Sequence, residues 1–98
     1  MKQGLPSAKE AAEGLAIQAL TFIAGDAERL GRFLAVTGIG PQEIRSAARE
    51  PGFLTGVLDY LVTDEALVTA FATEAAIDPA LVEKARAALG GAWEREIP

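Results

Sequence analysis

Apolar residues recur at helical spacing along most of this chain. The first series follows Ser7, which forms a capping box with Glu10, and its apolar positions are Ala8, Ala12, Leu15, Ala19, Phe22 and Ile23. Gly25 suits the left-handed residue that ends such a helix. Because no stretch alternates apolar and polar residues with a period of two, the pattern predicts helices and no strands.

Two further helices are predicted between Asp26 and Pro51. Asp26 caps the first of them and Gly38 is placed to end it. Pro41 fits the first position of the next helix, where its missing N–H costs nothing, and Pro51 ends that helix. The expected inner faces of the two helices hold Leu30, Phe33, Leu34, Ile44, Ala47 and Ala48, which leaves Arg45 and Arg49 on an outer face.

The stretch from Phe53 to Ala75 is compatible with one long helix or with two. Continuing the apolar stripe of Phe53, Leu54, Val57, Leu58 and Leu61 at 100° per residue would place two carboxylates, Asp64 and Glu65, within it. A break at Thr63 removes this conflict, with Thr63 as the cap of the second helix. We therefore expect two helices.

Asp78-Pro79 opens a last helix, and Gly90-Gly91 is expected to stop it before Trp93. The short connections predict an all-α fold, a compact orthogonal bundle of five to six short helices. We expect one domain over residues 1–98, with flexible ends at about 1–6 and 91–98, because 98 residues leave no room for a second core.

Composition narrows the range of functions. The chain has no Cys and no His, so it lacks thiolate zinc ligands, a Cys or His nucleophile and the usual proton shuttle at neutral pH. Ser7 and Ser46 have no His to act as their general base. No secretory signal or apolar stretch of membrane-spanning length is present. We expect a cytoplasmic protein that is not an enzyme, needs no cofactor or metal, and does not enter a membrane.

The charge is distributed unevenly. The net charge is −5, and from Glu50 to Glu83 there are seven carboxylates and no Lys or Arg. Four arginines lie in the middle of the chain: Arg29, Arg32, Arg45 and Arg49. They could bind phosphate or an acidic partner, or pair with the carboxylates of Glu28, Asp59, Asp64 and Glu65. Capping explains Asp64 and Glu65 better than a metal or catalytic role does.

The Gly38-Ile39-Gly40-Pro41 segment is similar to the loop of the helix-hairpin-helix DNA-binding motif, in which backbone N–H groups approach a phosphate. Glu43 would lie in the first turn of the next helix and compete for the same anion site. The acidic balance also disfavours nucleic acid. A tight corner between two helices is therefore the preferred interpretation, and nucleic-acid binding through this loop with Arg45 and Arg49 is the alternative.

Trp93 either folds back onto the bundle or anchors a partner. With no catalytic constellation, the leading hypothesis is a protein-interaction module. Its candidate partner surface comprises Arg45, Arg49 and Trp93. Its protein partner is unknown, and the chain itself is expected to be a monomer or a weak homodimer.

The combined pattern resembles domain-of-unknown-function family 3572, a group of small, mainly alphaproteobacterial proteins. The resemblance runs from about Ala8 to Leu89. It rests on Leu30, Phe33, Leu34, Thr37 to Pro41, Ile44, Arg45, Pro51, Phe53, Leu54, Val57 to Leu61, Asp64, Glu65, Leu67 and Phe71. It implies a small bacterial domain and assigns no activity and no site residue.

Overall fold

The fold is described by a computed structural model of the 98-residue chain, which places residues 7–50 and 52–95 and describes side chains as far as residue 90. Over these residues the chain forms six helices and no strand. The helices are α1 (Ala8–Ala24), α2 (Ala27–Thr37), α3 (Ile44–Ala47), α4 (Phe53–Val62), α5 (Glu65–Ala75) and α6 (Ala80–Arg95). The all-α helical bundle predicted from the pattern of apolar residues is confirmed.

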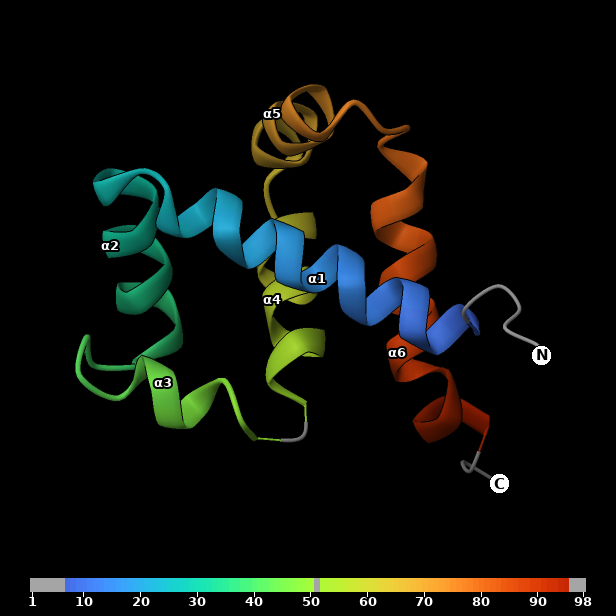
Figure 1. The fold of residues 1–98 in the computed structure, drawn as a ribbon, viewed down its shortest axis with the longest axis horizontal. Helices are drawn as coiled ribbons and strands as arrows, with labels where there is room; N and C mark the ends of the chain where they lie inside the picture. Colours follow the sequence, from blue (N-terminus) through green and yellow to red (C-terminus); the bar gives the residue numbers. More distant parts are fainter. Residues whose placement is uncertain (1–6, 51, 96–98) are drawn as a thin grey trace, which may run out of the picture.

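Helix α1 organises the bundle. It runs across the front of α4 and α6 in Figure 1, with α2 and α3 on one side and α5 above. It packs against α6 and α4, and also against α2 and α5. The face that it buries is made mainly of small side chains, Ala12, Ala16 and Ala19, with Phe22 and Ile23 near its end. Small side chains allow the crossing helices to approach closely.

The core continues on the other helices. Its buried members there are Phe33 of α2, Val57, Leu58 and Leu61 of α4, Phe71 and Ala72 of α5, and Val82 and Ala85 of α6. Three aromatic pairs join the helices. Phe22 meets Phe71 with ring centroids 5.4 Å apart, and Phe33 meets both Phe53 and Tyr60 edge to face. These tilted and edge-to-face arrangements are favoured by the ring quadrupoles.

Several predicted helix ends are confirmed. Both hydrogen bonds of the capping box form, since the Ser7 hydroxyl accepts from the Glu10 N–H and the Glu10 carboxylate accepts from the Ser7 N–H, each at 3.1 Å. Asp26 caps α2, and the Asp78 carboxylate accepts from the Ala80 N–H at the start of α6. Gly38 ends α2 in the left-handed conformation, with φ of 78°.

The predicted break between α4 and α5 is also confirmed, but its cap is not Thr63. The side chain of Asp64 accepts hydrogen bonds from the N–H groups of Ala66 and Leu67, so Asp64 caps α5. The Thr63 hydroxyl instead donates to the Tyr60 carbonyl, behind it in α4. A Thr in the last turn of a helix readily bonds backward in this way, which leaves the next carboxylate to cap the following helix.

Two predictions about glycine are wrong. Gly25 has φ of −75°, so α1 ends in a right-handed turn and not at a left-handed residue. Helix α6 does not stop at Gly90-Gly91 but continues to Arg95. Each glycine costs a helix only about 1 kcal/mol and keeps its backbone hydrogen bonds. The packing of α6 against α1 and α4 opposes that cost.

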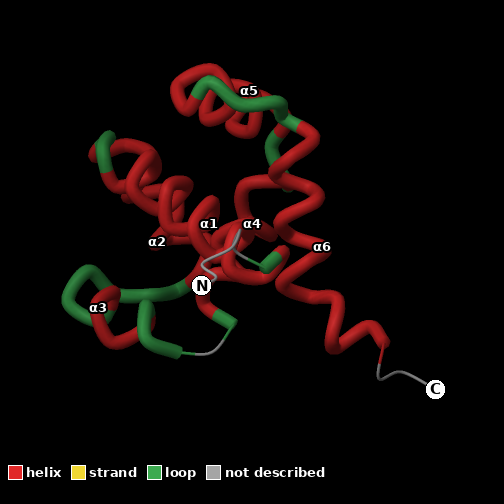
Figure 2. Tube along the Cα trace, turned by 45° about the vertical axis from the view of Figure 1, so that its right-hand side comes forward, coloured by secondary structure: helices red, strands yellow, loops and turns green. Residues whose placement is uncertain are grey.

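The third helix is shorter than predicted. Residues 41–43 form a turn, and α3 is the single helical turn that follows (Figure 2). Ile44 and Ala47 are half-buried as expected, but Ala48 is exposed. A single turn has too few residues to bury a full face, which explains the exposure of Ala48. Pro51, predicted to end this helix, lies outside the described residues.

Candidate functional site

The two arginines of the predicted partner surface lie on and just after α3. Arg45 belongs to the helix and Arg49 follows one turn later, and both side chains are exposed. Among the described side chains, the ion pairs are those of Arg86 with Asp59 and Glu83. Asp59, expected as a partner of the central arginines, therefore pairs with α6 instead. Arg45 and Arg49 have no ion-pair partner within the part of the chain whose side chains are described.

Trp93 is not brought to this surface. Its backbone lies near the end of α6, and its side chain falls outside the described residues. Figures 1 and 2 both show α3 and the C-terminal end of α6 on opposite sides of α4. The three residues predicted to form one surface are thus divided between Arg45 and Arg49 on one side and the Trp93 position on the other.

The Gly38 to Pro41 loop is closed by its own hydrogen bonds. The Gly40 N–H donates to the Glu43 carboxylate at 3.2 Å, and the Glu43 N–H donates to the Gly40 carbonyl at 2.9 Å. The Ile39 N–H donates to the Thr37 hydroxyl. A phosphate at Gly40 would have to displace a carboxylate, and it would also be repelled by it. This geometry supports a tight corner and counts against a phosphate cradle.

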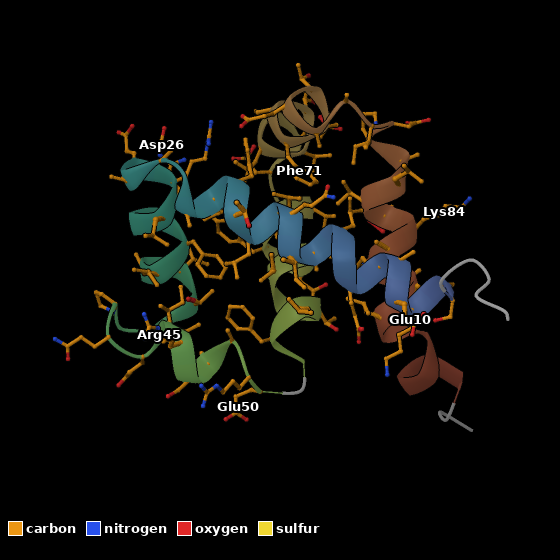
Figure 3. All side chains as sticks on the ribbon, viewed as in Figure 1. Glu10, Asp26, Arg45, Glu50, Phe71 and Lys84 are labelled. Carbon is orange, nitrogen blue, oxygen red and sulfur yellow. The ribbon has the colours of Figure 1, made fainter. Side chains whose placement is uncertain are left out.

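A cleft that the sequence analysis did not identify lies where α1, α2 and α5 meet. It has a volume of about 480 Å³ and is lined by Ile17, Gln18, Thr21, Phe22, Gly25, Arg29, Phe71, Glu74 and Ala75. Phe71 projects from α5 toward α1 in Figure 3. Ile17, which lines the same cleft as Phe22 and Phe71, is 54% exposed.

Arg29 is held firmly at the edge of this cleft. Its guanidinium carbon lies 3.9 Å from the centroid of the Phe22 ring, a cation–π contact. Its Nη1 donates at 3.2 Å to the Phe22 carbonyl at the C-terminal end of α1, an oxygen that also accepts from the Gly25 N–H at 3.3 Å. Helical periodicity gave no sign of this contact, because the chain turns sharply between Phe22 and Arg29.

A second, smaller cleft of about 210 Å³ lies on the other side of Arg29. It is polar, and its lining is Asp26, Glu28, Arg29, Arg32, Tyr60, Asp64 and Leu67. Figure 3 shows Asp26 at the corner between α1 and α2. The pKa of Asp26 is lowered from 3.8, because its carboxylate accepts hydrogen bonds from the backbone N–H groups of Arg29 and Glu28. The two acidic caps at this cleft, Asp26 and Asp64, thus already accept hydrogen bonds from backbone N–H groups at the starts of α2 and α5.

The lowered pKa of Asp26 predicts an acid-sensitive contribution to stability. The folded pKa lies below the unfolded one, so the contribution is present above about pH 4 and is lost as the pH falls through the folded pKa. Asp26→Asn keeps a capping oxygen but does not titrate. We expect the urea midpoint of the wild type to exceed that of Asp26→Asn at about pH 7, and the difference to shrink at about pH 2.5. An equal difference at both pH values would contradict this prediction.

A third groove, almost entirely apolar, lies between α1 and α6. Its volume is about 400 Å³, and its lining is Ala8, Ala11, Ala12, Leu15, Leu81, Lys84, Ala85 and Ala88. Leu81, which lines this groove, is 41% exposed. Lys84 points out into solvent in Figure 3. The alanines form a shallow floor, because they leave space where longer side chains would fill the angle between the helices.

Among the described residues, no group of three or more acidic side chains lies close enough together to hold a metal ion. None of the helices in that part of the chain combines the length and the apolar character needed to cross a membrane. The recognisable surfaces are thus the exposed Arg45 and Arg49, the cleft beside Arg29 and the apolar groove.

The fold and these surfaces define a small all-α bundle with open clefts between crossing helices. The chain belongs to the family of proteins of unknown function DUF3572, whose profile matches residues 9–92. The match covers every helix described above except the first residue of α1 and the last three of α6. No curated protein and no solved structure matches the chain.

Proposed function

We propose that this protein is a non-enzymatic protein-interaction module of the cytoplasm, and that it docks an acidic segment of a partner through Arg45 and Arg49. The observation that supports the proposal is the exposure of both guanidinium groups, without an ion-pair partner among the described side chains. Guanidinium groups bind carboxylates through paired hydrogen bonds, which makes arginine a common anchor at interfaces.

Charge determines the range at which such docking acts. A chain of net charge −5 repels an acidic partner at long distance. At physiological ionic strength that repulsion is screened beyond about 8 Å, so the local Arg45–Arg49 surface dominates once the partners touch. Binding should therefore depend on these two side chains and only weakly on charges elsewhere on the molecule.

Affinity capture from native lysate tests the proposal with three baits. They are the wild type, Arg45→Glu/Arg49→Glu, and the control Lys9→Glu/Lys84→Glu, in which both lysines are exposed on other helices. Both double variants change the net charge by the same amount. We expect a specific partner to be retained by the wild type and the lysine control, and lost from the arginine variant. Equal retention by all three, or no specific partner, would overturn the proposal.

The Trp93 part of the predicted surface is tested separately with Trp93→Ala. Because α3 and the end of α6 lie on opposite sides of α4, we expect this bait to keep a partner that binds Arg45 and Arg49. Loss of the same partner from both variants would show one continuous surface.

A further inference from the structure

Arg29 differs from Arg45 and Arg49 in that the fold already restricts its side chain. The cation–π contact with Phe22 and the hydrogen bond to the Phe22 carbonyl fix the guanidinium against the corner of α1 and α2. A free arginine side chain loses rotamer freedom when it binds, at a cost of up to about 2 kcal/mol. Arg29 has already lost much of its rotamer freedom in the folded protein. Its remaining N–H donors are therefore preorganised to bind an acceptor.

Those donors have no ion-pair partner among the described side chains. Arg29 interacts electrostatically with Asp26, but the Asp26 carboxylate accepts hydrogen bonds from the backbone N–H groups of Glu28 and Arg29. A guanidinium carries five N–H donors, and Arg29 uses one on the Phe22 carbonyl. The geometry therefore leaves an anchored cation at the edge of the cleft with unused hydrogen-bonding capacity.

The rest of the cleft favours a ligand that carries an apolar group as well as a negative charge. Its floor includes the Phe22–Phe71 pair, and the 54% exposed Ile17 adds an aliphatic wall. Glu74 lies on the α5 side and disfavours a second negative charge there. A complementary ligand thus has one carboxylate next to one large apolar side chain.

We propose that the cleft between α1, α2 and α5 is a second docking site, which takes a partner segment presenting a carboxylate beside a large apolar side chain. Arg29 binds the carboxylate, and Ile17 with the aromatic floor receives the apolar group. The inference rests on the proposed function only in assuming a protein partner. It concerns different residues from Arg45 and Arg49.

The test is a titration of the intact, isotopically labelled protein, followed through its backbone amide NMR signals. The probe is N-acetyl-L-phenylalanine, which has one carboxylate next to one aromatic side chain. Its matched controls are N-acetyl-L-phenylalanine amide, which lacks the charge, and acetate, which lacks the ring. We expect saturable shifts confined to residues 17–29 and 71–75, with affinity at least about tenfold weaker for either control, as expected for a charge-assisted pair and a buried ring.

Protein variants complete the test. Arg29→Gln should weaken binding of the probe at least about tenfold, and Ile17→Asn several-fold. Lys9→Gln, at an exposed position in the first turn of α1 outside the cleft, should bind the probe as the wild type does. Thermal unfolding of each variant checks its fold. If Arg29→Gln does not fold, Ile17→Asn and the amide probe decide the outcome.

Three results would overturn the inference. The first is that no signal shifts up to the solubility limit of the probe. The second is that the amide control causes shifts of the same size, and the third is that Arg29→Gln and Ile17→Asn both bind the probe as tightly as the wild type. Concentration-dependent shifts at the same residues without probe would assign the cleft to a second copy of the chain and would also overturn it. None of these outcomes bears on Arg45 and Arg49, so the docking site and the proposed function can fail separately.

Discussion

Phe33→Ala is expected to lower the free energy of unfolding by about 3–5 kcal/mol, a large share of the roughly 5–15 kcal/mol of a typical domain. Phe33 is 1% exposed and is the buried residue of α2. It packs edge to face on two rings of α4, Phe53 at 6.3 Å and Tyr60 at 5.1 Å between centroids. Loss of the ring would leave a cavity and separate α2 from α4. Urea denaturation followed by far-UV circular dichroism measures the change.

Phe33→Leu is the matched control. It keeps most of the apolar volume and loses the aromatic pairing, which contributes about 0.5–1.5 kcal/mol beyond burial. We therefore expect it to cost clearly less than the alanine variant. A loss below about 1 kcal/mol for Phe33→Ala would show that α2 is not held through this ring.

Ala16→Leu is expected to be the next most damaging of the changes considered. Ala16 is fully buried on the face of α1 that packs between its neighbours, and α1 contacts both α4 and α6. A leucine there adds three carbons at a position with 0% exposure, so we expect the helices to move apart. Overpacking of this kind costs about 1–3 kcal/mol. For a domain of this size, the thermal midpoint should fall by at least about 4 °C.

Ala11→Leu provides the comparison on the same helix. Ala11 is exposed and lines the open groove between α1 and α6, where the added carbons have room. We expect a change within about 0.5 kcal/mol of the wild type. Equal destabilisation by both variants would mean that the close approach of α1 does not depend on small residues.

Local signals in the sequence predicted most helix ends, because caps act over three or four residues. Ser7 with Glu10, Asp26, Gly38 and Asp78 all have the expected roles at helix ends. One failure arose where tertiary packing determined the result. Gly90 and Gly91 are weak helix formers, yet α6 passes through them while packed against α1 and α4.

The candidate sites were predicted less well. The exposure of Arg45 and Arg49 followed from helical periodicity and is confirmed. The anchoring of Arg29 on Phe22 was not foreseen, because it depends on the angle at which α2 leaves α1. The grooves themselves arise from the crossing of helices distant in sequence, which periodicity along one helix does not describe.

The central position of α1 has a consequence for how the protein is made. Helix α1 is the first described helix to leave the ribosome and α6 the last, yet the two pack against each other. A nascent chain that ends before Ala80 exposes the groove-forming and core faces of α1 to solvent. Contacts between distant segments slow folding, and exposed apolar surface favours aggregation. Synthesis of the last helix is therefore the step at which the bundle closes.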